Sequence, residues 1–201
     1  GLVPVEAAGI SLGELAVGSG YGTSTKCVVG GPGPAVVRIP NLVAGRVDLT
    51  DEKQARDAEV DLSSYMLQAG DLLIVRTNGS KDLIGRSAVV QEGVSAAFAS
   101  YLIRFRLDEA KVRPDWVRLM LERPSTRAVL ESLAASSAGQ HNLSLGKLKP
   151  LEIPVPSMTA QSRLLVSWAE ESAATDRLAK TIENAECRAE SLRRAVLAAA
   201  F

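Results

Sequence analysis

The last segment of the chain, from Ser157 to Phe201, contains neither glycine nor proline. These two residues are the strongest helix breakers, so their absence predicts one uninterrupted helix, about 60 Å long at about 1.5 Å per residue. Such a helix is longer than those of ordinary globular domains, which run to about 20 residues. We therefore expect this helix to have a partner outside a single compact domain.

Apolar residues in this segment recur with the seven-residue repeat of a coiled coil. Two companion positions of the repeat carry Trp168, Leu178, Ile182, Ala185, Leu192 and Val196. We predict that these residues form a dimerisation seam against the helix of a second copy, running antiparallel. The alternative is an amphipathic helix that packs on its own domain.

The part of the chain before Ser157 has the opposite composition, with short apolar runs interrupted by Gly, Pro and Asn. Strands are predicted at residues 35–39, 71–77, 87–90 and 98–107, and helices at 114–122 and 125–135. A capping box formed by Ser11 and Glu14 predicts a further short helix. The fold class expected is a mixed α/β (α+β) domain over residues 1–156, followed by a long C-terminal coiled-coil helix over residues 157–201.

Charge and cysteine content exclude several classes of protein. Lys and Arg together number 23, as do Asp and Glu, so the net charge is zero and positive charge for a nucleic acid must be placed locally. The only cysteines, Cys27 and Cys187, lie far apart, which argues against a disulfide framework or a zinc site and favours a reducing, cytoplasmic location. No apolar run is long enough to cross a membrane.

Recognisable catalytic motifs are absent from the sequence. His141 is the only histidine, so a two-histidine metal site cannot form, and a hydrogen-bonding role in its loop is the simplest interpretation. The glycine cluster at residues 30–33 lacks the Lys-Ser/Thr pair of a phosphate-binding loop. No Asn-Pro-Pro-aromatic or Asp-Pro-Pro-aromatic tetrapeptide of a methyltransferase occurs either. We therefore predict no catalytic residue and no metal site in this chain.

Four polar segments accompany the predicted strands, at residues 21–26, 38–41, 76–81 and 140–144. Hydroxyls, amides, backbone N–H groups and Arg or Lys side chains bind phosphate oxygens, and Arg, Asn and Gln can also pair with base edges. These segments suggest DNA contact, but plain structural roles stay open at this point. Asn78-Gly79 is a common turn, and Arg38 can pair with an acidic neighbour.

The order of the segments resembles that of type I restriction-modification specificity subunits. The segments that carry the resemblance are GYGTSTK, PAVVRIPNLVAGRVDLTD, GDLLIVRTNGSKDLIGRSAVV, FASYLIRFR, GQHNLS and LEIPVPSMTAQ. They run nearly end to end and correspond to one target-recognition domain with its following conserved helix, which is one half of a full subunit. The residues expected to lie at DNA are Gly22, Thr23, Ser24, Lys26, Arg38, Asn41, Arg76, Asn78, Gly79, Ser80, Lys81, Gln140 and Asn142.

The resemblance also implies partners. In that family the specificity subunit selects the sequence on double-stranded DNA, while separate subunits methylate adenine with S-adenosylmethionine and cleave DNA with ATP. This chain would then carry no cofactor and would act in DNA methylation and phage defence beside methyltransferase subunits and a restriction/translocase subunit. The segment from Met158 to Gln161 departs from the more acidic segment of the family.

Three hypotheses follow from these observations. The first is a homodimer that recognises a two-part DNA site with identical inverted halves. The second is one half of a two-domain specificity subunit, which would recognise an asymmetric site. The third is a coiled-coil interaction scaffold that does not bind DNA.

Overall fold

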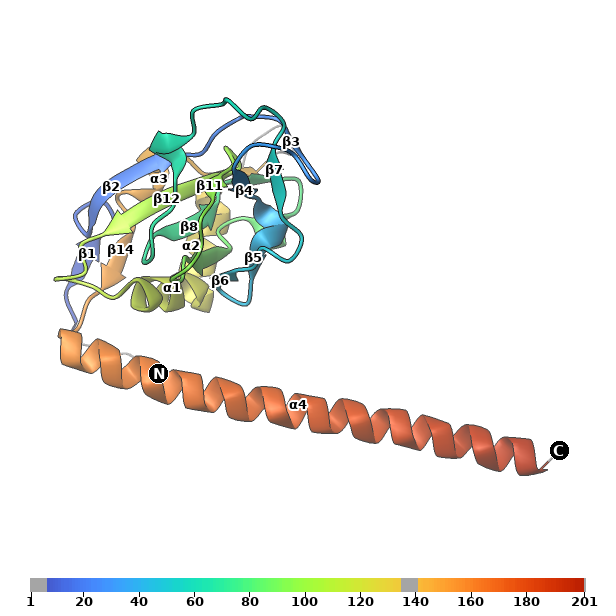
Figure 1. Ribbon diagram of the computed structural model, residues 1–201. Coiled ribbons are helices and arrows are strands. Elements are labelled where there is room, and N and C mark those ends of the chain that lie inside the picture. Colours follow the sequence, from blue (N-terminus) through green and yellow to red (C-terminus); the bar gives the residue numbers. More distant parts are fainter. Residues whose placement is uncertain (1–6, 135–140, 201) are drawn as a thin grey trace. The chain divides into compact units, whose positions relative to one another are not determined.

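The computed structural model describes residues 7–134 and 141–200, and the chain divides into two compact units, residues 1–161 and 162–201 (Figure 1). The strands are β1 (Gly9–Ser11), β2 (Ala16–Tyr21), β3 (Cys27–Val28), β4 (Ala35–Val37), β5 (Leu42–Val43), β6 (Arg46–Val47), β7 (Lys53–Ala55), β8 (Leu72–Val75), β9 (Thr77–Asn78), β10 (Ser87–Val89), β11 (Ala97–Phe98), β12 (Leu102–Leu107), β13 (His141–Asn142) and β14 (Glu152–Pro154). The α-helices are α1 (Pro114–Glu122), α2 (Pro124–Ala134), α3 (Leu145–Leu148) and α4 (Met158–Ala200), and the 3-10 helices are η1 (Ile39–Asn41), η2 (Ser63–Tyr65) and η3 (Lys81–Leu83).

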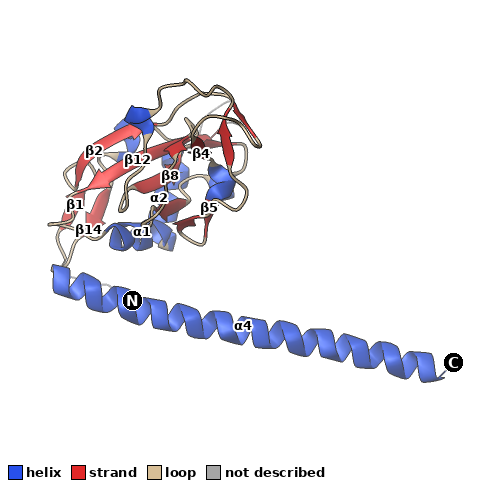
Figure 2. Ribbon diagram, viewed as in Figure 1, coloured by secondary structure: helices blue, strands red, loops and turns tan. Residues whose placement is uncertain are grey.

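The first unit is mixed α/β, as predicted. Its strands are short and long loops join them (Figure 2). A six-stranded sheet has the order β2-β12-β8-β10-β6-β5, in which only the β10–β6 pair is parallel. A four-stranded sheet has the order β11-β4-β7-β3, and two short ladders, β1-β14 and β13-β9, complete the unit.

Strand β8 lies at the centre of the six-stranded sheet and is buried on both faces. Its four consecutive apolar residues, Leu-Leu-Ile-Val, are all fully buried. An unbroken apolar run is the pattern of a strand covered on both sides, so the predicted strand is confirmed at residues 72–75, whereas Thr77, which the prediction included, belongs to β9 of another sheet. Leu73 and Val75 join Val37 and Phe98 of the four-stranded sheet in one core, which fixes the two sheets together.

Helix α1 begins at Pro114 and ends at Glu122, as predicted. Proline suits the first position of a helix because its missing N–H would have no helical partner there. The helix contacts β10 and β14, and the indole of Trp116 donates a hydrogen bond to the Pro154 carbonyl at 2.8 Å. Helix α2 follows after a single residue.

Two local predictions were wrong. Residues 98–107 form not one strand but β11 and β12, which belong to different sheets, because the chain turns at Ala99 to Tyr101. The capping-box hydrogen bonds between Ser11 and Glu14 do form, but they close a turn between β1 and β2 rather than start a helix. Here the pairing of β2 with β12 outweighs the local helix signal.

Helix α4 is one continuous helix of 43 residues, about 65 Å long, so the prediction of a long C-terminal helix was correct. Its first turn belongs to the first unit. There the buried side chain of Gln161 accepts a hydrogen bond from the Arg113 N–H and donates one to the Pro156 carbonyl. These bonds fix where the helix starts.

The predicted seam residues of α4 beyond Trp168 are exposed. Leu178, Ile182, Leu192 and Val196 are each more than half exposed, and Ala185 is exposed too, whereas Trp168 is half-buried. Their pairing with a second helix stays a prediction. None of the described helices has a stretch apolar enough to cross a membrane.

Candidate nucleic-acid interface

Two of the predicted polar segments meet in the β9–β13 ladder. His141 pairs with Asn78 and Asn142 with Thr77, and the Leu143 N–H donates to the Arg76 carbonyl at 2.7 Å. Residues far apart in sequence therefore share one backbone frame immediately after the central strand β8. Gln140, also predicted at DNA, lies outside the described residues.

The turn between β11 and β12 brings in two further segments. The Ser100 N–H donates to the Thr23 carbonyl at 2.8 Å, and the Thr23 N–H donates to the Phe98 carbonyl at 2.8 Å. On the other side, the Arg76 N–H donates to the Tyr101 carbonyl at 2.9 Å. We use the name loop cluster for residues 21–26, 38–41, 76–81, 98–101 and 141–144.

Arg76 lies within the loop cluster, half-buried rather than on an exposed turn. Its guanidinium donates to the Asn142 Oδ1 at 3.2 Å and to the Ser100 carbonyl at 3.4 Å, and it lies 4.5 Å from the centre of the Tyr21 ring. Among the described residues no carboxylate lies within 4.0 Å of it. Arg76 is therefore a fixed positive charge that no acidic group neutralises.

Arg38 and Asn41 hold their own loop together. The Arg38 guanidinium donates to the Asp51 carbonyl and lies 3.8 Å from the Asp51 carboxylate, so it does have an acidic neighbour. The Asn41 side chain is 1% exposed, accepts from the Arg38 N–H and donates to the carbonyls of Asp48 and Asp51. Because these bonds occupy the buried amide, we do not expect Asn41 to touch DNA directly.

The remaining predicted residues differ in exposure. Gly22 and Thr23 are packed under the turn after β11, whereas Ser24, Lys26, Gly79, Ser80, Lys81 and Asn142 are exposed. Neither Lys26 nor Lys81 has an ion-pair partner among the described residues. The exposed members thus combine free ammonium groups with hydroxyl and amide groups.

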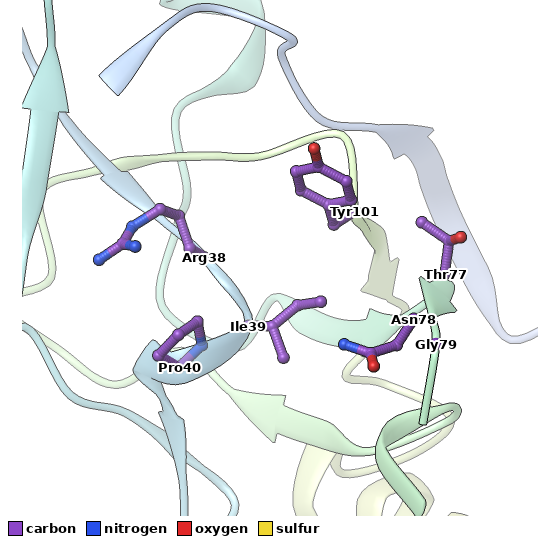
Figure 3. Close-up of a pocket in the computed structure, with 7 residues that line it drawn as sticks. All are labelled: Arg38, Ile39, Pro40, Thr77, Asn78, Gly79 and Tyr101. Atoms are coloured by element: carbon purple, nitrogen blue, oxygen red, sulfur yellow. The ribbon is translucent and has the colours of Figure 1, made fainter. Parts of the chain in front are cut away.

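A pocket of about 360 Å³ opens between these loops (Figure 3). It is lined by Arg38, Ile39, Pro40, Thr77, Asn78, Gly79 and Tyr101. Three of these residues were predicted at the site. Tyr101 was missed because it was assigned to a strand. The alternation of apolar and polar residues in that strand is broken by two consecutive apolar residues, Leu102 and Ile103, both of which are buried in the structure. That break was the available signal for a turn.

Chemical groups suited to catalysis are not assembled here. Within residues 7–134 and 141–200 no three His, Cys, Asp or Glu side chains are grouped to hold a metal ion. Burial raises the pKa of the Cys27 thiol, which disfavours the reactive thiolate. The loop cluster offers charge, hydrogen-bond donors and an aromatic ring, which are groups for binding.

Sequence comparison identifies relatives along most of the chain. No protein-family model matches it. The EcoKI specificity subunit of Escherichia coli K12, a type I restriction enzyme, is 28% identical over 182 residues, which are 90% of this chain and 39% of that protein. The type I StySPI specificity subunit of Salmonella potsdam is 27% identical over 192 residues, 95% of this chain and 42% of that protein.

Solved structures share the fold. A chain from a structural study of complex assembly and conformational transition in a type I restriction-modification system aligns with a TM-score of 0.73 at 16% identity over 97% of this chain and 45% of its own length. The HsdS subunit of Thermoanaerobacter tengcongensis aligns with a TM-score of 0.60 at 17% identity over 87% and 40%. The homologues of this chain are thus type I restriction enzyme specificity subunits, of whose length it spans about two fifths.

Proposed function

We propose that this chain recognises a DNA sequence on behalf of the methyltransferase subunits of a type I restriction-modification system. The observation that carries the proposal is the loop cluster, whose segments contain Lys26, Arg38, Arg76 and Lys81 and whose pocket is lined in part by Arg38. A chain with no net charge can bind a polyanion only where its cations gather. The homologous subunits support the same role.

The positive groups of the loop cluster have complementary roles in this proposal. The exposed ammonium groups of Lys26 and Lys81 neutralise phosphates, which gives affinity and salt dependence. The immobilised groups around the pocket face the base edges, where a fixed geometry gives selectivity. S-adenosylmethionine and ATP belong to the partner subunits, including a restriction/translocase subunit where one is present.

A second recognition unit completes the site. The relatives are more than twice as long as the matched segment, so the second unit is either a second copy joined through α4 or another half of the same polypeptide. The exposed Leu178, Ile182 and Leu192 favour a helical partner for α4. A homodimer requires identical inverted half-sites, whereas a two-domain subunit requires an asymmetric site.

Methylation mapping tests this function. The chain is co-expressed with the methyltransferase subunit encoded beside it in a host that lacks other adenine methylation, and methylated bases are mapped along the host genome. We expect methylation at a two-part sequence. Identical inverted half-sites would indicate the homodimer, and two different half-sites would indicate the two-domain subunit. Omitting the chain is the control, and an unchanged methylation pattern without it would overturn the proposal.

Binding measurements separate DNA recognition from the scaffold alternative. The full chain is titrated with mixed-sequence duplex DNA at several salt concentrations. A DNA-binding unit loses affinity steeply as salt rises because bound counterions are released from the phosphates. An interaction scaffold shows neither binding nor a salt slope.

A further inference from the structure

The pocket of the loop cluster presents a hydrogen-bond donor of fixed direction. The Asn78 Oδ1 accepts the Ser80 N–H at 2.8 Å, which closes a short turn and sets the orientation of the amide. Among the described residues, no group accepts a hydrogen bond from the Asn78 Nδ2. Figure 3 shows this amide directed from β9 towards Ile39.

The wall opposite Asn78 is apolar. Ile39 and Pro40 line it, and Ile39 also packs against the buried core that includes Val37 and Phe98. The ring of Tyr101 borders the same space, with 57% of the residue exposed. A donor and an apolar surface therefore face each other across the pocket.

Only one base edge in the major groove combines an acceptor with an apolar group. Thymine presents its O4 acceptor beside its C5 methyl, whereas guanine presents two acceptors and no methyl, cytosine presents a donor, and adenine presents an acceptor next to a donor. We propose that this pocket receives the major-groove edge of a thymine, with Asn78 Nδ2 donating to O4 and Ile39 contacting the methyl group. This inference rests on the proposed function.

The test begins with a selection. The full chain is used to enrich duplexes from a randomised pool, which yields the preferred sequence. We expect at least one position of the selected sequence where thymine is required. Replacing that thymine by deoxyuridine removes only the methyl group and should weaken binding about fourfold, the equivalent of one buried methyl.

Substitutions in the pocket test whether its residues recognise the required thymine of the selected sequence. Asn78→Asp keeps the oxygen that accepts from Ser80 but replaces the NH₂ donor by an acceptor. The preference for thymine over cytosine at this position should fall about tenfold. The ratio of the two affinities is the decisive quantity, because an added negative charge weakens binding to every DNA. Asn78→Ala is the uncharged second variant and should lose the same preference.

Ile39→Val tests the methyl contact directly. The difference in affinity between thymine and deoxyuridine should shrink in this variant, so that the two changes are not additive. Val17→Ala serves as the control, because Val17 is exposed and does not line the pocket. Thermal melting checks that each variant is folded.

The outcomes separate the two proposals. Enrichment of a specific sequence that Asn78→Asp, Asn78→Ala and Ile39→Val leave unchanged would overturn the thymine pocket while the recognition function stands. A thymine position indifferent to loss of its methyl would also overturn it. If no sequence is enriched at all, the proposed function fails and the pocket assignment fails with it.

Discussion

Gly22 lies where the first segment of the loop cluster passes under the turn after β11. A Cβ at this position would lie 2.3 Å from the Phe98 carbonyl oxygen and 2.4 Å from that of Ala99. Both are backbone oxygens that already accept hydrogen bonds, Phe98 from the Thr23 N–H and Ala99 from the Leu102 N–H, so they have little freedom to move. We expect Gly22→Ala to lower the free energy of unfolding by about 1–3 kcal/mol, measured by urea denaturation.

Gly20 is the matched control for that substitution. It lies two residues earlier in β2, and a Cβ there would meet no atom within 4 Å. Gly20→Ala should leave the free energy of unfolding unchanged or raise it slightly, because alanine restricts the unfolded chain. Equal losses from both substitutions would contradict a close-packing role for Gly22.

Asp71 is a second single residue on which the fold depends. Its side chain is fully buried, and the carboxylate accepts from Nε and Nη2 of Arg106 at 2.8 and 2.9 Å and from the Gln68 N–H. Asp71→Ala leaves these donors without an acceptor, so we expect a loss of about 3 kcal/mol in urea denaturation. The exposed pair Arg46–Asp115 gives the comparison, since Arg46→Ala should cost under about 1 kcal/mol.

At the scale of elements, the segment after β8 carries two positively charged side chains, one exposed and one held by hydrogen bonds. Lys81 is exposed without an ion-pair partner in the described part of the chain, whereas Arg76 is bonded to Ser100 and Asn142. Lys81→Ala should reduce the magnitude of the logarithmic salt slope of DNA binding by about one and leave the melting temperature unchanged. Arg76→Ala should lower both DNA affinity and melting temperature.

Lys111 provides the control for these two variants. It pairs with Asp108 outside the loop cluster, so Lys111→Ala should leave the salt slope unchanged. An unchanged slope in Lys81→Ala would remove this segment from the interface. A melting temperature unaffected by Arg76→Ala would show that its contacts add nothing to stability.

Helix α4 allows an equally direct test of its seam. Ile182→Asp places a charge at the centre of the predicted dimer contact and should weaken dimerisation at least about a hundredfold, because a buried unpaired charge is costly. Asn184→Asp adds the same charge away from the seam and should leave the dimer intact. Sedimentation of the full chain over a range of concentrations measures both. Dimerisation unchanged by Ile182→Asp would rule out this seam.

Sequence patterns predicted the elements whose stability is local or whose burial is complete. Helix α1 was predicted to the residue by Pro114 and an amphipathic pattern, and β8 by its apolar run. Strand β2, with the sequence Ala-Val-Gly-Ser-Gly-Tyr, was missed because its glycines give no strand signal and its pairing with β12 supplies the structure. Its stability comes from tertiary contacts.

The candidate site, too, could be predicted from the sequence only in part. The polar segments were identified from residue type, and four of the five described stretches of the loop cluster were among them. Their assembly depends on pairings such as His141 with Asn78, which join distant parts of the chain and leave no periodic pattern in either segment. The burial of Asn41 depends on how its own loop folds, and the position of Tyr101 at the pocket depends on the turn between β11 and β12, so residue type alone could not predict them.

At the scale of the whole molecule, α4 should set the distance between two recognition units. Inserting one heptad after Ala185 adds about 10.5 Å and keeps the seam facing its partner, so a dimer should persist in light scattering. Recognition of the original two-part site should fail, because about three base pairs of extra separation also rotate the groove by about 100°.

A five-residue insertion at the same place is the control. It rotates the following seam residues by about 140° to another side of the helix, so it should abolish the dimer itself. A heptad variant that stays dimeric and binds the original site with unchanged affinity would show that the helix does not set the spacing. Selection of a new, longer site by that variant would give the positive result.

The backbone hydrogen bonds of the loop cluster also bear on how such a chain can evolve. Thr23, Arg76, Ser100 and Leu143 take part in this frame through main-chain N–H and C=O groups, which nearly every amino acid supplies. Point mutations can therefore exchange the neighbouring side chains while the scaffold persists. Under the proposed function, new target preferences can arise in small steps, each starting from a protein that still folds.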